Sequence, residues 1–205
     1  EDAIEKSCDA NAIVIIRAHG TTPTILERIN KTGALVIDTT CPKVKASQKR
    51  AEKYSLQGAM VFIAGDLGHG EVTSISSYAN EKAIVIKDRT EALSFLESQE
   101  FLANSKKFDT AILISQTTIR KEEYDEIAEV LQNAIPSLQV FNTICSATKE
   151  RQVSLRELAK KVDGILVIGG KHSANTQRLF SLAQELHKQS ALIESSDEIP
   201  ESFYH

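Results

Sequence analysis

The chain carries the same pattern twice, with a cysteine at the equivalent position of each copy. Asp38–Cys41 aligns with Asn142–Cys145 at an offset of 104 residues (145 minus 41). In each copy a cysteine loop precedes an amphipathic helix, an apolar strand, a glycine and a polar turn with histidine. The identities at this offset are Thr39 and Thr143, Cys41 and Cys145, Lys45 and Lys149, Gln48 and Gln152, and Gly65 and Gly169. Equivalent positions of tandem repeats tend to face a shared axis, so the pattern predicts two thiols at one site.

Cutting the repeat from cysteine to cysteine predicts its boundaries. Residues 1–40 are the expected tail of a first repeat, residues 41–144 a complete middle repeat, and residues 145–205 a third repeat cut short. Because the sequence begins without methionine, we expect a segment of a longer polypeptide. Two cysteines are too few to hold a metal cluster, and a third copy of the pattern is missing from these residues.

Short apolar runs rich in Val and Ile are separated by helical patterns. The runs are continuous, which is typical of parallel strands covered on both faces. We expect strands at 12–16, 34–37, 60–64, 83–86, 110–114, 138–141, 164–168 and 191–193. We expect helices at 42–57, 91–96, 119–134, 148–162 and 176–188, and a surface loop at 98–107. Together they predict an α/β fold of tandem repeats with small parallel sheets flanked by helices.

Composition excludes several classes of function. The chain is 41% hydrophobic and 25% charged, with a net charge of -4 and both signs interspersed. Since no basic tract occurs, a nucleic-acid partner is not expected. No apolar run reaches the roughly 20 residues of a membrane helix. Three cysteines do not make a disulfide framework, which indicates a reducing compartment.

Cys41 and Cys145 each open a predicted helix. Backbone N–H groups and the helix dipole there favour a thiolate, the form that binds iron–sulfur clusters or zinc. A single cysteine is more often a small buried hydrophobe, but two at equivalent positions favour metal ligands. Cys8 lies outside the repeated pattern, and we expect no ligand role for it.

Polar turns follow the carboxyl ends of the predicted strands, where open parallel sheets bind ligands. His69-Gly70-Glu71 offers an imidazole for an anion and a carboxyl group for proton transfer. It also fits a helix N-terminus with Glu71 placed for the dipole. The turns at 19–22 and 169–175 fit either anion binding or ordinary helix capping. Thiols, anion sites and one Glu together indicate a metallocluster enzyme acting on a small phosphorylated substrate.

The ordered motifs resemble the 4-hydroxy-3-methylbut-2-enyl diphosphate reductase family, which completes the methylerythritol phosphate route to isoprenoids. The resemblance runs along the whole chain and is carried by Ala18–Gly20, Asp38–Pro42, Gly68–Val72, Gln116–Thr118, Thr143–Thr148 with Arg151-Gln152, and Gly169–Asn175. It implies three α/β repeats around a pseudo-threefold axis. One cysteine from each repeat would hold a [4Fe-4S] cluster with one iron left open.

The resemblance also implies roles for matching residues. Cys41 and Cys145 would be two of the three cluster ligands, Glu71 would deliver protons, and Thr117 would position the reacting hydroxyl. The residues implied in substrate binding are His19, His69, Thr117, Ser173 and Asn175. Two electrons from a ferredoxin or flavodoxin, with two protons, would give isopentenyl and dimethylallyl diphosphate. The expected location is the bacterial cytoplasm or the plastid stroma.

The chain departs from the family pattern toward its ends. The family's first cysteine, in a Gly-Phe-Cys-type motif, has no match here, nor do a further substrate histidine and a late Gly-Ala-Ser segment. Position 174 is Ala where Ser is common. We therefore predict that these 205 residues alone have no reductase activity and hold a cluster poorly or not at all. Two alternatives stay open: a cluster enzyme resembling quinolinate synthase, which acts on carboxylates, and a non-catalytic thiol or zinc module.

Overall fold

A computed structural model describes residues 7–80, 83–104, 109–187 and 189–204 of the chain. It has an α/β fold, and the strand pairings among these residues are parallel. The chain forms two compact units, one of Glu1–Gln116 with Glu122–Thr143 and one of Thr117–Lys121 with Ile144–His205. The predicted fold class is confirmed, whereas the division into three repeats stays a prediction.

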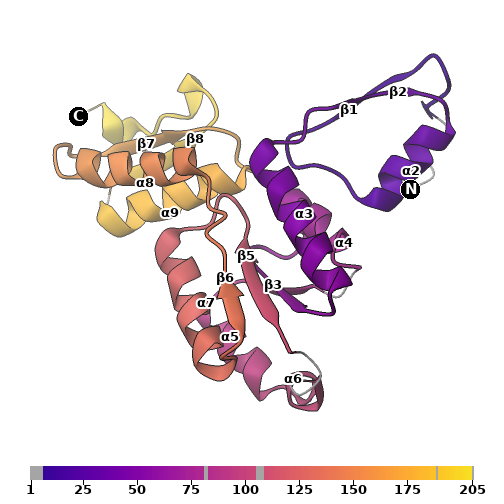
Figure 1. The fold of residues 1–205 in the computed structure, drawn as a ribbon. Coiled ribbons are helices and arrows are strands. Elements are labelled where there is room, and N and C mark those ends of the chain that lie inside the picture. Colours follow the sequence, from indigo (N-terminus) through magenta and orange to yellow (C-terminus); the bar gives the residue numbers. More distant parts are fainter. Residues whose placement is uncertain (1–6, 81–82, 105–108, 188, 205) are drawn as a thin grey trace. The chain divides into compact units, whose positions relative to one another are not determined.

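The first unit contains a two-stranded and a four-stranded sheet (Figure 1). Its elements are β1 (Ile13–Ile16), α2 (Pro23–Lys31), β2 (Leu35–Asp38), α3 (Pro42–Leu56), β3 (Met60–Ala64), α4 (Gly70–Ser77), β4 (Ile84–Ile86), α5 (Arg89–Glu97), α6 (Gln99–Asn104), β5 (Ala111–Ser115), α7 (Lys121–Ala134) and β6 (Leu138–Val140). The larger sheet has the strand order β4-β3-β5-β6, so its two longest strands are central.

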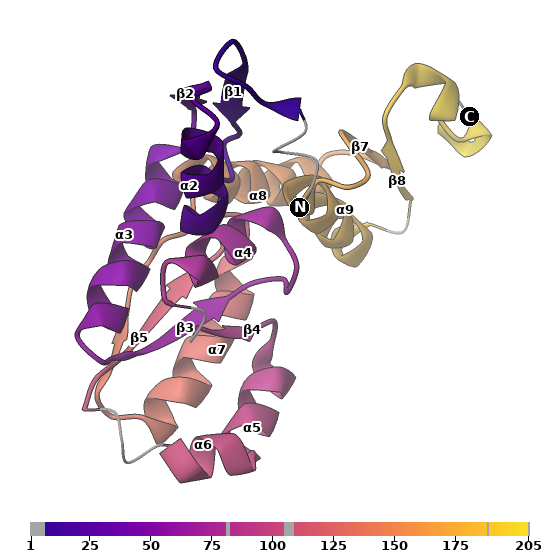
Figure 2. The ribbon, with the colours of Figure 1, turned by 90° about the vertical axis from the view of Figure 1, so that its right-hand side faces the viewer.

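Helices cover both faces of the four-stranded sheet (Figures 1 and 2). On one face, α3 and α4 form a core cluster with Ile63 of β3 and Ile114 of β5, both fully buried. On the other face, the Phe62 ring contacts the Phe95 ring of α5 at 5.7 Å between centroids. On this face the Tyr124 hydroxyl of α7 donates a hydrogen bond to the backbone carbonyl of Leu113 in β5. This double coverage explains why the β3 and β5 sequences are continuously apolar.

The second unit is built on a two-stranded sheet, with Ile165 of β7 paired to Ser190 of β8. Its elements are α8 (Ser146–Ala159), β7 (Ile165–Ile168), α9 (Ala174–Leu186), β8 (Ser190–Ile193), and the 3-10 turns η2 (Ser196–Glu198) and η3 (Glu201–Phe203). Its small core joins β7 to Ala183 of α9 and to apolar side chains of α8. Ile168, at the end of β7, is 72% exposed.

The predicted strands are confirmed, and each of their ends lies within one residue of the prediction. The five predicted helices are also confirmed, with ends within three residues of the prediction. The loop predicted at 98–107 is wrong over its first part, which forms α6; residues 105–108 and 188 lie outside the described residues. Ser98 begins this helix, because its hydroxyl accepts from the Phe101 amide at 3.2 Å. The centroid of the Phe101 ring lies 5.5 Å from that of the Phe95 ring, and this contact stabilises the helix although the surrounding sequence is polar. Helices α2 and α4 were not among the predicted helices.

Candidate functional site

The carboxyl ends of β3 and β5 form a topological switch point in the first unit. Ala64 pairs with Ser115 at the ends of these neighbouring strands. The chain leaves β3 into α4 on one face of the sheet and leaves β5 toward α7 on the other. Gln116 is fully buried between the two ends, where its amide donates to the Ala64 carbonyl at 2.8 Å and its side-chain oxygen accepts from the Asp66 amide at 2.9 Å. Open parallel sheets bind ligands at such a point.

His69 and Glu71 lie at the N-terminus of α4, directly after β3. His69 is the N-cap residue, and its Nδ1 accepts from the Glu71 amide at 3.2 Å. Because Nδ1 is the acceptor, the proton of the neutral ring lies on Nε2. Glu71 is in the first turn of the helix and is 2% exposed. The motif therefore caps a helix, and it places an imidazole and a buried carboxyl group at the switch point, while their roles in anion binding and proton transfer stay predictions.

His19 meets His69 although 50 residues separate them (69 minus 19). The ring centroids are 5.0 Å apart, with the planes tilted by 56°. His19 follows β1 in a turn whose Gly20 has a positive φ of 76°. A Cβ at Gly70 would lie 3.7 Å from His19 Nδ1, an ordinary contact distance, so the start of α4 lies next to this ring. Two imidazoles therefore share one corner of the first unit, beside the N–H groups that begin α4.

The sequence did not predict a role for the buried polar network that holds this turn. Gln48 Nε2 donates to Ser74 Oγ at 2.7 Å, and the Ser74 hydroxyl donates to the Thr21 carbonyl at 3.1 Å. A Cβ at Gly20 would lie 2.5 Å from Gln48 Nε2 and 2.8 Å from Ser74 Oγ, which leaves no room for a side chain. The only sequence signal was the recurrence of this glutamine as Gln152.

Cys41 is the N-cap residue of α3 and lies beside the His19 turn. Its amide donates to the carbonyl of Ala18, the residue before His19, at 3.0 Å. The side chain is partly buried against the α3–α4 core cluster. Three residues earlier, Asp38 pairs with Lys45 at 2.6 Å. The hydrogen bond from Lys45, followed by that from the Thr40 hydroxyl, lowers the pKa of Asp38 to about 2. The loop before Cys41 is thus fixed by an ion pair and local hydrogen bonds.

The second unit holds the other predicted residues. Cys145 is the N-cap residue of α8, and its amide donates to the carbonyl of Thr117 at 2.9 Å, as Cys41 does to Ala18. Ser173 caps α9, with its hydroxyl 3.4 Å from the Thr176 amide. Asn175 Oδ1 is buried without a hydrogen-bond partner among the described residues. Because Oδ1 is an acceptor, a donor group of a ligand would satisfy it.

The structure thus brings His19, His69, Glu71 and Cys41 together in the first unit, and Thr117 with Cys145 in the second. That the two thiols serve one site stays a prediction. Among the described residues, no group of three or more His, Cys, Asp or Glu side chains is placed to hold a metal ion. The three cysteines are free of disulfides. Two thiols at helix N-termini are the kind of ligand that an iron–sulfur cluster needs, but two are too few to hold one.

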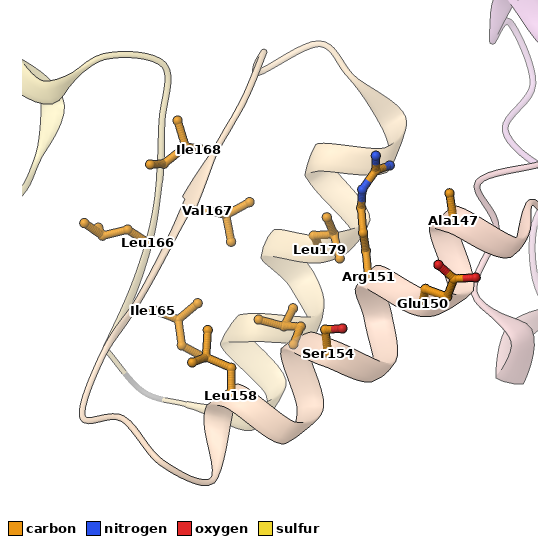
Figure 3. A pocket seen from close by; sticks show the side chains of 11 residues that line it. Ala147, Glu150, Arg151, Ser154, Leu158, Ile165, Leu166, Val167, Ile168 and Leu179 are labelled. Atoms are coloured by element: carbon orange, nitrogen blue, oxygen red, sulfur yellow. The ribbon is translucent and has the colours of Figure 1, made fainter.

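A cavity in the second unit lies away from the predicted residues (Figure 3). It is a groove of about 550 Å³ between β7 and the helices α8 and α9. Apolar side chains from Ile165 to Ile168 line one side, and Arg151 and Glu150 lie at one end of the opposite side. None of the predicted site residues lines it, so we do not assign the substrate to it.

In the described part of the chain, every helix is too short or too polar to cross a bilayer.

Comparison with known proteins identifies relatives along almost the entire chain. The family model described as "LytB protein" matches residues 2–205. A protein of Treponema denticola named 4-hydroxy-3-methylbut-2-enyl diphosphate reductase is 46% identical over 95% of this chain. One of the same name from Campylobacter hominis is 39% identical over 93%. These names support the reductase hypothesis over the two alternatives.

Solved structures agree in fold. The reductase of Plasmodium falciparum, 22% identical, superposes with a TM-score of 0.85 over 97% of this chain and 60% of its own. A second solved reductase, described as the terminal enzyme of the non-mevalonate pathway, is 32% identical with a TM-score of 0.64. The chain spans 65% of the Treponema denticola relative and 54% of that from Treponema pallidum.

Proposed function

Because the chain belongs to the LytB protein family, we propose that it is part of a reductase that removes the hydroxyl group of 4-hydroxy-3-methylbut-2-enyl diphosphate. In the balanced reaction the C–O bond breaks, two electrons and two protons are consumed, and water leaves with isopentenyl or dimethylallyl diphosphate. The observation that supports this best is the corner where His19 and His69 meet, 5.0 Å apart, beside buried Glu71 and the Cys41 loop.

The imidazoles are suited to bind the anionic substrate. Nε2 of His69 carries the proton in the neutral ring, since Nδ1 accepts from the Glu71 amide at 3.2 Å. The N-terminus of α4 adds backbone N–H groups and the positive end of a helix dipole. In the second unit, we infer that Ser173 and Asn175 bind the same class of ligand, because the Ser173 hydroxyl and the Asn175 Nδ2 amide group can donate to phosphate oxygens at the start of α9.

Glu71 is the proposed proton donor. Its side chain is almost fully buried beside His69, and a protonated carboxyl group there can give a proton to a leaving hydroxyl. Thr117, buried and joined through its carbonyl to the Cys145 amide, is the proposed contact to that hydroxyl. The cluster would be held by Cys41, Cys145 and a ligand outside these residues, and when bound it would supply electrons and a Lewis acid.

The carrier of the electrons is proposed to be a ferredoxin or flavodoxin, in the bacterial cytoplasm or plastid stroma. Three disulfide-free thiols fit such a reducing compartment. The 205 residues alone should show no turnover, because one cluster ligand is missing.

A longer polypeptide, expressed from the parent gene and reconstituted anaerobically with iron and sulfide, tests the proposal. We expect visible iron–sulfur absorption and conversion of the diphosphate substrate. Cys41→Ala or Cys145→Ala should abolish both, whereas Cys8→Ala, the matched control, should change neither. Glu71→Gln should keep the absorption and lower kcat by about 10²- to 10⁴-fold. A colourless, zinc-loaded protein that turns over no substrate would rule the proposal out.

A further inference from the structure

Helix α3 is strongly basic although the net charge of the chain is -4. Its sequence carries five Lys or Arg residues and one acidic residue. Lys45 is paired with Asp38 at 2.6 Å. Lys43, Arg50 and Lys53 share one stripe of the helix, because spacings of seven and three residues return to the same side. This stripe concentrates positive charge on the helix that begins at Cys41.

Aromatic rings lie against two of the cations of α3. Arg50 Cζ lies 4.4 Å from the centre of the Phe141 ring, and Lys53 Nζ lies 5.6 Å from that of Tyr54. The two rings contact each other at 5.6 Å between centroids. The Tyr54 hydroxyl donates to Gln139 Oε1 at 2.9 Å, which fixes the ring. We call Arg50, Lys53, Tyr54 and Phe141 the α3 patch.

The composition of the α3 patch is that of a binding hot spot. Arginine and aromatic residues are enriched at the centres of protein interfaces, and lysine is depleted there. Arg50, Tyr54 and Phe141 are half-buried, so they are held in place, while Lys53 is exposed at the rim. Among the residues that the structure describes, neither Arg50 nor Lys53 forms a salt bridge, so their charges are available to an acidic partner.

The chain connects the α3 patch to both proposed cluster ligands. Arg50 lies nine residues after Cys41, about 14 Å along the helix at 1.5 Å per residue. Phe141 precedes Cys145 by four residues. The Phe141 carbonyl accepts from the buried Tyr124 hydroxyl at 2.7 Å, which fixes the start of this segment. A protein bound at the patch therefore contacts the helix and the segment that lead to the two thiols.

We propose that the α3 patch is the docking surface for an acidic electron-carrier protein, an inference that rests on the proposed reductase function. That reaction consumes two electrons per hydroxyl group removed, and the reduced carrier supplies them in two one-electron transfers, so that two electron equivalents of carrier are oxidised. Complementary charge steers such a carrier to the patch and makes its association sensitive to salt. Arg50 provides a planar donor group for its carboxylates.

Binding of oxidised flavodoxin to the full 205-residue chain, followed by calorimetry, tests the docking surface directly. We expect Arg50→Glu to weaken binding by at least about tenfold, and Arg50→Lys by less, because charge is kept and the planar group is lost. Lys87→Glu, the control, makes the same charge change at another exposed cation of the first unit and should alter affinity less than about twofold. Circular dichroism checks that each variant is folded.

The proposal is overturned if Arg50→Glu and Lys87→Glu have equal effects, if flavodoxin does not bind, or if an acidic protein without a redox group binds as tightly. In the longer reconstituted enzyme, Arg50→Glu should slow flavodoxin-driven turnover by at least about tenfold and leave dithionite-driven turnover unchanged. Normal flavodoxin-driven turnover in that variant also overturns it. Absent turnover with dithionite, despite a full complement of cluster, would instead contradict the reductase function.

Discussion

In each copy the cysteine is preceded by two strands, and the first of them is β1 before Cys41 and β5 before Cys145. Of these two equivalent strands, only β5 is buried along its whole length. Ile112 and Ile114 of β5 are 0% exposed, whereas the matching Ile13 and Ile15 of β1 are 63% and 62% exposed. β5 is paired with β3 on one edge and β6 on the other, while β1 is paired with β2 alone in the described part of the chain. An apolar run therefore predicts a strand, whereas the strands and helices beside it determine whether that strand is buried.

The backbone connections after these strands are nevertheless the same. The Cys41 amide donates to the Ala18 carbonyl, and the Cys145 amide to the Thr117 carbonyl. The Thr39 hydroxyl donates to the last carbonyl of β1, as the Thr143 hydroxyl does to that of β5. The local backbone geometry is thus the same in the two copies, while the burial within these 205 residues differs. Three substitutions test this contrast, two of them with a matched substitution in the other copy.

The largest effect is expected from removing a buried methyl-rich side chain. Ile114→Ala should lower the free energy of unfolding by about 2–5 kcal/mol, because a cavity forms in the core. The equivalent Ile15→Ala should lower it by about 0.5 kcal/mol or less, since Ile15 is mostly exposed. Urea denaturation of both variants measures the difference. Equal losses would show that β1 is packed as well as β5 and would end the comparison.

A smaller effect is expected at the two equivalent threonines. Thr143 Oγ1 accepts from the Ser115 amide at 2.7 Å and donates to the Ser115 carbonyl at 3.0 Å. Thr143→Val should destabilise the protein by about 1–3 kcal/mol, because buried backbone groups lose their partner. Thr39→Val should change stability by less than about 0.5 kcal/mol, as Thr39 is exposed to water. Thermal unfolding is a sufficient measurement, and a reversed order would contradict the assignment of burial.

The smallest effect concerns the ion pair found in one copy alone. Asp38 pairs with Lys45, whereas the aligned position in the other copy is Asn142. The pKa of Asp38, about 2, lies below its usual 3.8 because Lys45 and the Thr40 hydroxyl donate to it. The pair therefore stabilises the fold above about pH 4, and this contribution is lost as the pH falls toward about 2.

Asp38→Asn should lower stability by less than about 1 kcal/mol at neutral pH, since the pair is partly exposed, and by much less near pH 2, where Asp38 is largely protonated in the unfolded chain and about half protonated in the folded one. Carboxyl titration by NMR together with urea unfolding at the two pH values measures both quantities. A titration midpoint at the usual value, or a loss independent of pH, would show that the pair is absent in solution.

Much of the fold could be predicted from the sequence, because apolar runs and cysteine-headed helices are local signals. Helix α2 was missed although Thr22 caps it and Pro23 occupies its first turn, which are recognisable start signals. Helix α6 was missed because its polar sequence hides the contact of Phe101 with Phe95. Short helices that depend on one tertiary contact leave little periodicity to detect.

The candidate site was predictable residue by residue but not as an arrangement. The motifs identified His19, His69 and Glu71 separately. The contact between the two imidazoles depends on how the β1 turn packs on α4, through Gln48 and Ser74. Such long-range packing has no sequence periodicity. The recurrence of Gln48 as Gln152 was the one available hint, and it indicated a repeat rather than a role.

Cys41 and Cys145 are both N-cap residues, yet neither side chain makes a capping hydrogen bond. Ser, Thr, Asn or Asp at this position typically adds about 1 kcal/mol of helix stability over a residue that cannot cap. The chain therefore forgoes that stabilisation at two helices. A laboratory selection for heat resistance alone would favour exchanging both sulfurs for oxygen, and so would yield a sturdier scaffold that has lost the chemistry proposed for it.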